Sequence, residues 1–355
     1  MKKVLLGMSG GVDSSVAALL LKKQGYEVIG AFMKNFSDTK NKMTGECSWV
    51  EERKMAQKIA ILLGIPFITI DSEKEYKKNV IEPMFRDYFR GLTPNPDMLC
   101  NKIIKFPVLW REAKKIGAEY IATGHYARIK KNKIEYALLE GKDKTKDQSY
   151  FLAELTQNDL SHTLFPVGNL IKLEVREIAR KNKFPNYDKK GTRGICFVGK
   201  VNMKSFLEKK IKNKKGKVID FNGSFLGYHP GSMYFTIGQR IGQSLGFEIE
   251  KHLEGKWYVA EKRKNVIVIA PESHKILKRQ IVKINNIHFL NPRKKIFHRL
   301  KARIRHLGVL HSGKLMAKGR NYYFKFSKPL EQVAEGQYIV LYKSRRVVAS
   351  GEMRF

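Results

Sequence analysis

The chain has 355 residues, of which 43% are hydrophobic, so it can bury a sizeable core and does not have the composition of a disordered protein. This length predicts two or three domains. No apolar run approaches the roughly 20 residues of a membrane span. The apolar run after the first lysines stops at Gly7, which is too early for a signal peptide, so we expect a cytoplasmic protein that does not bind membranes.

Lys and Arg number 69 against 33 Asp and Glu, which gives a net charge of +36. A surplus of this size favours a polyanionic partner, and nucleic acid is the obvious candidate. The alternative is a lysine-rich proteome, because many of the lysines lie in solvated runs such as 209–217. The three cysteines, Cys47, Cys100 and Cys196, form no C-x-x-C pair and therefore signal neither a zinc ribbon nor a disulfide framework.

Residues 1–126 alternate strand-like and helix-like patterns. We expect strands at 3–8, 27–33, 67–71 and 118–126, and helices at 14–24, 50–64 and 106–117. This succession predicts a parallel sheet with helices on both faces and a ligand site at the carboxyl ends of its strands. Gly7, Met8, Met33, Gly124 and His125 fall at such ends, so they are candidates to line one nucleotide pocket.

The pattern becomes helical and polar from about 143 to 210 and β-rich after Lys217. We expect short strands within 233–242, 256–263, 266–270, 299–308, 322–329 and 337–353. The fold class is therefore α/β: a parallel-sheet nucleotide-binding domain, a smaller β-rich central domain and a C-terminal β-barrel. We place these domains at 1–200, with a helical segment at about 143–195, at 201–277 and at 278–355.

The stretch "LGMSGGVDSS" is a glycine-rich turn between a strand and a helix, a place where free backbone N–H groups bind phosphate. It lacks the lysine of a Walker loop and the spacing of a dinucleotide fingerprint. Its serine hydroxyls and glycines can surround a phosphate, and the Asp13 carboxylate can hold Mg²⁺. The alternative is an ordinary helix cap after a glycine turn.

Cys100 lies in "TPNPDMLCNKIIKF", where two prolines fix a rigid turn. A helix that starts near Asp97 places that carboxylate and the thiol on one face, and a helix N-terminus lowers the pKa of a thiol. The alternative is a capping Asp beside a buried structural Cys. Cys196 lies in "GTRGICFVGK"; its apolar neighbours favour a buried strand position, whereas Gly191 and Gly194 favour a mobile thiol suited to sulfur relay.

Six motifs follow one another in the order "GMSGGVDSS", "TPNPDMLCNKIIKF", "ATGHYAR", "KDQSYFL", "GICFVG" and "FTIGQRIG". Along essentially its whole length the chain resembles the tRNA-specific 2-thiouridylases of the PP-loop ATP pyrophosphatase superfamily. The resemblance implies an ATP- and Mg²⁺-dependent sulfurtransferase. It implies that C2–O of the wobble uridine is adenylated and that sulfur then arrives from a cysteine persulfide, with release of AMP and pyrophosphate.

The resemblance also implies a role for each matched residue. Cys196 carries the persulfide, Cys100 is the second nucleophile that leaves a Cys100–Cys196 disulfide, and Asp97 is the acid/base group. The residues implied to bind ATP are Gly7, Met8, Ser9, Gly10, Gly11, Val12, Asp13, Ser14, Met33 and Gly124. The residues implied to contact the target base or the tRNA are Asn95, Pro96, Asp97, His125, Lys146, Asp147, Gln148, Arg303, Arg305 and Gln337. Without the resemblance, His125 could equally be a structural residue, and we treat Cys47 as structural or accessory.

The implied partners are tRNA acceptors for Lys, Glu and Gln and a persulfide donor, either a cysteine desulfurase or a sulfur-relay protein. Four segments depart from the family pattern: Ile103 replaces a common Glu, "GTRG" lacks a Ser, "VAEGQ" lacks a Pro, and "VVASGEM" lacks a Cys. These changes weaken the barrel assignments, and Arg303 and Arg305 match only loosely. The competing hypotheses are another adenylating PP-loop enzyme of the amidotransferase type and an RNA-binding module with a degenerate nucleotide fold.

Overall fold

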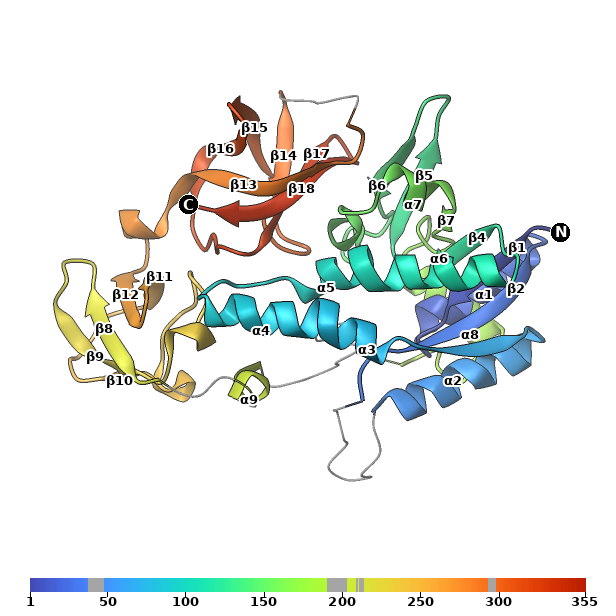
Figure 1. Cartoon of the computed structure of the whole chain (residues 1–355), viewed down its shortest axis with the longest axis horizontal. Helices are drawn as coiled ribbons and strands as arrows, with labels where there is room; N and C mark the ends of the chain where they lie inside the picture. The colour runs from blue at the N-terminus through green and yellow to red at the C-terminus, as the bar shows by residue number, and fades with distance from the viewer. Residues whose placement is uncertain (38–47, 190–202, 209, 211–213, 293–297) are drawn as a thin grey trace.

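The computed structural model describes residues 1–37, 48–189, 203–208, 210, 214–292 and 298–355. Figure 1 shows three parts: an α/β part that contains the N-terminus, a small β-sheet part, and a barrel that contains the C-terminus. In the segments just named, we find no helix that combines the length and apolarity needed to cross a membrane.

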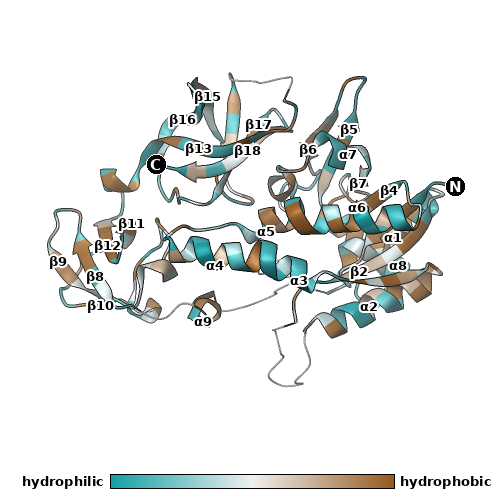
Figure 2. Cartoon of the chain, viewed as in Figure 1, coloured by the Kyte–Doolittle hydropathy of each residue, from teal (hydrophilic) through white to brown (hydrophobic). Residues whose placement is uncertain are grey.

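A five-stranded parallel sheet forms the centre of the α/β part. Its order is β3-β2-β1-β4-β7, and the strands are β1 (Lys3–Gly7), β2 (Glu27–Lys34), β3 (Phe67–Asp71), β4 (Tyr120–Thr123) and β7 (Thr163–Leu164). Every pairing is parallel. These strands are mostly apolar, as Figure 2 shows by their brown colour, because both faces of the sheet are covered. The predicted parallel sheet is confirmed.

Side chains of β1 alternate between two hydrophobic cores. Val4 and Leu6 pack with residues of α1 (Val12–Lys23), α2 (Ser48–Leu63) and α8 (Lys172–Lys181). Leu5 packs on the other side, with residues of α6 (Phe106–Lys115). Successive side chains of a strand point to opposite faces, so the helices lie on both sides of the sheet, as the sequence predicts.

Two helical stretches run from the sheet toward the other parts of the molecule (Figure 1). The first joins α3 (Glu73–Tyr76), a π-helical segment and α4 (Glu82–Phe89). The second joins α5 (Pro96–Leu99), a π-helical segment (Cys100–Lys105) and α6. The described helices are completed by α7 (Gln157–Ser161) and α9 (Met203–Glu208).

The central part is a five-stranded sheet of order β10-β9-β8-β12-β11, in which only β8 and β12 pair in parallel. Its strands are β8 (Gly216–Asp220), β9 (Phe225–His229), β10 (Glu248–Ile249), β11 (Trp257–Arg263) and β12 (Val266–Pro271). The strand expected within 233–242 is wrong. That segment is a 3-10 turn followed by a loop, and its pairing with β11 is limited to an isolated bridge between Arg240 and Tyr258. Gly238 has a φ of +82°, which interrupts the extended backbone of a strand.

The C-terminal part is a closed barrel of six strands. Its order is β13-β16-β15-β14-β17-β18, and β13 pairs with β18 to close the ring. The strands are β13 (Arg279–Phe289), β14 (Leu300–Arg303), β15 (His311–Lys318), β16 (Asn321–Leu330), β17 (Tyr338–Lys343) and β18 (Arg346–Arg354). The predicted fold class is thus confirmed.

A hairpin from the α/β part extends the barrel sheet. Its strands are β5 (Ala127–Lys131) and β6 (Tyr136–Glu140), and β6 pairs antiparallel with β18 at Leu139 and Arg346. The Arg346 side chain also lies 2.5 Å from Glu135, whose carboxylate is buried. The sequence did not predict this hairpin, which fixes the barrel against the α/β part.

Candidate functional site

The order of the parallel sheet determines where its ligand site lies. From β1 the chain continues to one side through β2 and β3, and β4 and β7 lie on the other side. The order in which strands are added to the sheet therefore reverses between β1 and β4, although all strands stay parallel. Ligands of such sheets bind at the carboxyl ends of the strands at this reversal. The glycine-rich loop follows β1 there, and Gly124 follows β4.

Hydrogen bonds within the loop hold its shape. The backbone N–H of Ser9 donates to Ser14 Oγ at 3.2 Å, and both Ser14 Oγ and Ser15 Oγ donate to the carbonyl of Gly11 at 3.0 Å. Gly11 is the N-cap of α1, and no side chain among the described residues accepts a capping hydrogen bond from this helix. The first backbone N–H groups of α1 therefore face the reversal point as donors for an anion.

Glycines are required at two positions of this site. Gly10 has a φ of +72°, and a Cβ there would collide with the backbone of Glu52. A Cβ on Gly124 would lie 2.7 Å from the backbone nitrogen of Ser14. The end of β4 thus packs directly against the start of α1, which explains why both motifs need glycine.

Two residues that the sequence analysis did not predict bind Asp13. The Tyr126 hydroxyl donates to Asp13 Oδ1 at 2.7 Å, and Lys172 Nζ lies 2.5 Å from the same oxygen. Burial, then the nearby Asp13 charge, raises the pKa of Tyr126. Tyr126 therefore stays protonated and donates to the carboxylate.

Asn186 and Lys189 attach a third segment to the loop. The buried Asn186 amide donates to the carbonyl of Gly10 at 3.1 Å and to Ser15 Oγ at 3.0 Å, and Lys189 Nζ donates to the same carbonyl at 3.5 Å. Asn186 and Lys189 thus join the residues after α8 to the phosphate loop. Cys196 itself and Cys47 lie outside the described residues.

The helix that carries Cys100 begins as the sequence indicates, with Asn95 as its N-cap. Asn95 Oδ1 accepts the backbone N–H of Met98 at 3.2 Å, and Pro96 is the first helical residue. Cys100 is fully buried at the start of the π-helical segment, in the same hydrophobic core as Met33 and Leu5. Asp97, half-buried, precedes Cys100 by about one helical turn.

All three parts of the molecule meet at the turn before this helix. Gln337 of the barrel donates to the carbonyls of Thr93 and Pro94 at 3.1 and 3.2 Å, and accepts from the Asn95 amide at 3.4 Å. Thr93 Oγ1 donates to Thr236 Oγ1 of the central part at 3.2 Å. Gln337, predicted as a tRNA contact, is therefore a bridge between the barrel and the Cys100 helix in this structure.

His125 is buried between aromatic rings. Its Nδ1 lies 2.7 Å from Thr123 Oγ1, and its ring stacks on Phe106 at a centroid distance of 6.0 Å. Burial, then the Lys105 charge, holds the pKa of His125 well below its usual value. His125 is therefore neutral near pH 7 and has a structural partner on each side.

Asp147 and Arg303 form a buried ion pair between the α/β part and the barrel. Arg303 Nη1 lies 2.5 Å from Asp147, Nη2 lies 2.8 Å from Glu140, and all three side chains are at most 7% exposed. Direct contact of Asp147 or Arg303 with tRNA would require this interface to open. Gln148 accepts from the backbone of Tyr126 at 3.0 Å, whereas the remaining two predicted tRNA contacts, Lys146 and Arg305, are exposed.

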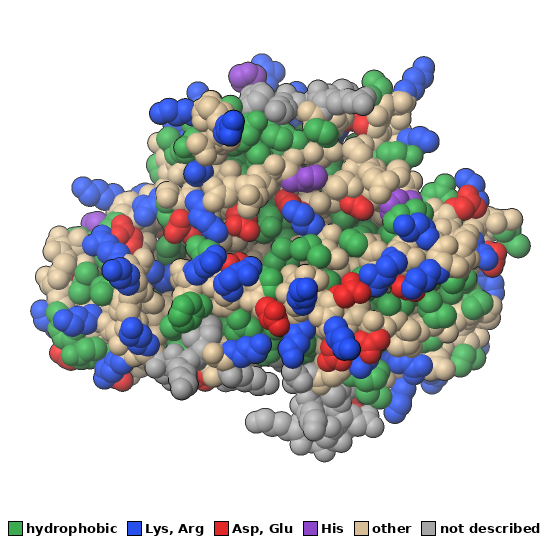
Figure 3. Space-filling view, viewed as in Figure 1, with side chains coloured by type: hydrophobic (Ala, Val, Ile, Leu, Met, Phe, Trp, Pro, Cys, Tyr) green, Lys and Arg blue, Asp and Glu red, His purple; other side chains and the backbone are tan. Residues whose placement is uncertain are grey.

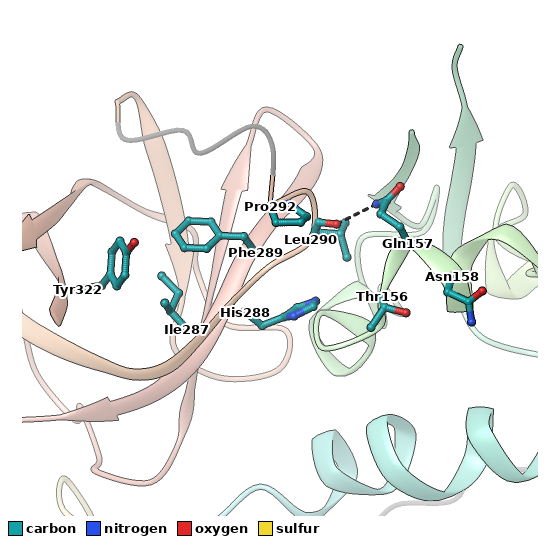
Figure 4. Close-up of a pocket in the computed structure, with 9 residues that line it drawn as sticks. All are labelled: Thr156, Gln157, Asn158, Ile287, His288, Phe289, Leu290, Pro292 and Tyr322. Carbon is teal, nitrogen blue, oxygen red and sulfur yellow. Dashed lines mark hydrogen bonds between the residues drawn. The ribbon is translucent and has the colours of Figure 1, made fainter. Parts of the chain in front are cut away.

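A cavity of about 630 Å³ lies elsewhere, between the start of α7 and strand β13 (Figure 4). The Gln157 amide, which lines the cavity, donates a hydrogen bond to the carbonyl of Leu290 on its other side at 2.9 Å. None of the predicted site residues lines it. This cavity is a groove between the α/β part and the barrel.

The sheet reversal, the glycine-rich loop and the free helix start define a nucleotide-phosphate-binding α/β protein joined to two β units. Family models described as "tRNA methyl transferase HUP domain", "tRNA methyl transferase PRC-barrel domain" and "Aminomethyltransferase beta-barrel domain" match residues 2–200, 204–271 and 279–353. The first of these covers more than half of the chain.

Full-length relatives identify the family. The tRNA-specific 2-thiouridylase MnmA of Christiangramia forsetii is 38% identical over 99% of this chain and 99% of its own length. The tRNA-specific 2-thiouridylase MnmA 1 of Geobacillus kaustophilus is 43% identical over 96% of this chain and 92% of its own. The chain belongs to the tRNA-specific 2-thiouridylase family.

Solved structures add little. A 4-thiouridine synthetase–RNA complex with bound ATP covers 59% of this chain at 15% identity and a TM-score of 0.36.

Proposed function

We propose that this protein is an ATP-dependent sulfurtransferase that converts the wobble uridine of tRNA to 2-thiouridine. The carrying observation is the complete S-G-G-x-D-S-S loop at the reversal of the sheet, with Gly124 packed against it. A degenerate nucleotide fold would have lost this geometry. Full-length relatives named 2-thiouridylases support the substrate, and they outweigh the methyl transferase label of the domain models, which match the same residues.

ATP would bind with its phosphates on the loop and the start of α1, and with its adenosine near Met33 and Gly124. Mg²⁺ is commonly held by one or two carboxylates together with the phosphates of the substrate, and Asp13 is the acidic residue of the loop. The uridine C2 oxygen would attack the α-phosphate and release pyrophosphate. A base must leave its stack for this reaction, and Asn95, Pro96 and Asp97 would bind it.

Two cysteines would then complete the transfer. The terminal sulfur of a persulfide on Cys196 attacks C2 and displaces AMP. The Cys100 thiolate next attacks the Cys196 sulfur, the S–S bond to the substrate sulfur breaks, and the sulfur stays on C2 while a Cys100–Cys196 disulfide forms. Asp97 would move the proton. Because Cys100 is fully buried, side chains that cover it must shift before it reacts. It lies at the start of a π-helical segment, a feature that is frequent at functional sites.

tRNA binding rests on charge. Lys and Arg side chains are scattered over the face shown in Figure 3 and outnumber Asp and Glu there, and the net charge is +36. Exposed Lys146 and Arg305 suit phosphate contacts, whereas the buried Asp147 and Arg303 suit a structural role. Each phosphate contact contributes a slope of roughly −0.7 to −0.9 to log affinity against log salt. A salt titration of tRNA binding measures how many contacts form.

The deciding experiment incubates tRNA with the protein, ATP, Mg²⁺ and a persulfide source, and analyses the nucleosides by mass spectrometry. We expect 2-thiouridine at the wobble position, together with AMP and pyrophosphate, and no product with Ser9→Ala. A methylated nucleoside, or ADP and inorganic phosphate as products, would contradict the proposal. Tests of Lys, Glu and Gln acceptors, and of a cysteine desulfurase against a relay protein as donor, define the partners.

A further inference from the structure

The phosphate loop has no cation of its own. From Gly7 to Leu21 the sequence contains no Lys or Arg, and the first basic residue after the loop is Lys22, in the last turn of α1. A Walker loop supplies a lysine to the outer phosphates from within the motif. Triphosphate binding and pyrophosphate release both concentrate negative charge, so a cation must come from another element.

Lys172 lies where that cation is needed. It is the first residue of α8, and its Nζ lies 2.5 Å from Oδ1 of Asp13, in the first turn of α1. Its side chain is 15% exposed and that of Asp13 is 32% exposed, so the pair is not sealed from solvent. The Tyr126 hydroxyl donates to the same oxygen, and Lys172 Nζ lies 5.8 Å from the centre of the Tyr126 ring.

The start of α8 is held rigidly. The backbone N–H of Lys172 donates to Asp143 Oδ2 at 2.9 Å, and the N–H of Ile171 donates to Glu174 at 2.7 Å. Asp143 thus fixes the backbone from which the Lys172 side chain extends toward Asp13. A fixed backbone lowers the entropic cost of placing a long side chain on a ligand.

A second cation lies one helical turn further along α8. Arg176 is close enough to Tyr126 for its positive charge to offset part of the rise in the pKa of that phenol. Its Nε is buried, and no hydrogen-bond partner is found for it among the described atoms. The face of α8 toward the loop is therefore basic, and its N-terminus also favours an anion.

We propose that Lys172 is the cation of the phosphate site: it binds the outer phosphates of ATP and then the released pyrophosphate. This inference rests on the proposed function, because it assumes that the loop binds ATP. Asp13 holds the ammonium group at the site before the nucleotide arrives. When ATP binds, Lys172 exchanges the carboxylate for phosphate oxygens, and Asp13 becomes available to Mg²⁺.

Calorimetric binding of ATP, pyrophosphate and AMP, without tRNA, tests this assignment. Lys172→Met should weaken ATP and pyrophosphate binding about tenfold or more, because a charge-assisted contact is lost. AMP binding, which needs no cation at the outer phosphates, should stay close to wild type and also reports that the variant is folded. Lys172→Gln, which can still donate to Asp13, should lose ATP affinity equally, and Lys172→Arg should retain most of it.

Lys142→Met is the matched control, because Lys142 pairs with Glu174 of the same helix but is 50% exposed. It should leave all three affinities unchanged. Unchanged ATP binding in Lys172→Met, or an equal loss for ATP and AMP, would refute the assignment in favour of a purely structural ion pair. Wild-type protein that binds ATP but does not thiolate tRNA would contradict the proposed function and leave the role of Lys172 intact.

Discussion

Replacing Arg303 by Met separates a structural role from an RNA-binding one. The Arg303 guanidinium contacts Asp147 and Glu140 inside the interface between the α/β part and the barrel. Breaking a buried ion pair by removing one partner typically costs about 3–5 kcal/mol. Asp147 keeps hydrogen bonds from Gly141 and Ser149, so we expect a loss near the lower end, about 3 kcal/mol.

Urea unfolding of the whole protein, followed by circular dichroism, measures this loss as a lower midpoint. Arg305→Met is the matched control, because Arg305 lies two residues along the chain and is exposed. Exposed substitutions usually change stability by less than about 0.5 kcal/mol. We therefore expect Arg305→Met to keep the unfolding midpoint and to reduce the salt slope of tRNA binding.

The opposite pattern would refute this reasoning. If Arg303→Met unfolds at the wild-type urea concentration and instead weakens tRNA binding, Arg303 contacts RNA and the buried pair contributes nothing to docking of the barrel. The structure would then represent a conformation that opens when tRNA binds.

Three further predictions concern the site and its surroundings. Gly124→Ala should abolish ATP binding and lower the unfolding midpoint, because the new Cβ collides with the backbone of α1. Wild-type ATP binding and an unchanged midpoint would show that the loop can move to accept the Cβ. Cys196→Ser should prevent persulfide loading, whereas Cys100→Ser should load sulfur but not deliver it to tRNA. Mass spectrometry of peptides digested without reductant locates the loaded sulfur. Full activity in both variants would exclude the relay. Burial lowers the pKa of Lys262 from 10.5 to about 8, so between these pH values the unfolded chain binds more protons than the folded one, and the free energy of unfolding should rise from pH 8 to 10.5. Lys262→Met should remove this pH dependence in urea unfolding. An unchanged pH dependence in the variant would assign it to another group.

Local features of the site could be predicted from the sequence. The apolar period placed the strands that end at Gly7 and Lys34 to within one residue, and two prolines with Asn95 placed the start of the Cys100 helix. These signals are local because backbone geometry and capping depend on neighbouring residues. The position of Gly124 at a strand end placed it in the nucleotide pocket, but its close approach to α1 could not be predicted, since it involves residues more than a hundred positions away.

Contacts between distant segments had no local signal. Nothing near Lys172 or Asn186 shows that their side chains bind the phosphate loop, and the β5–β6 hairpin pairs with β18 far along the chain. Arg303 resembled a surface residue of a basic segment, yet its partners bury it. The wrong strand within 233–242 has a different cause, since its apolar residues suggested a strand although the positive φ of Gly238 limits its pairing with β11 to a single bridge at Arg240.

The junction at Thr93 connects these distant contacts to the chemistry. Gln337 binds the Thr93 carbonyl across 244 positions, and the N–H of Thr93 donates to the carbonyl of Glu335 at 2.8 Å. Both contacts lie within three residues of Asn95, the cap that starts the Cys100 helix. Because a cap fixes where a helix begins, a shift of the barrel loop is passed to the cap and then to the helix that carries Asp97 and Cys100. We therefore expect Gln337→Ala to weaken the attachment of the barrel to this turn and to slow sulfur transfer more than persulfide loading; equal rates in the variant and the wild type would contradict such coupling.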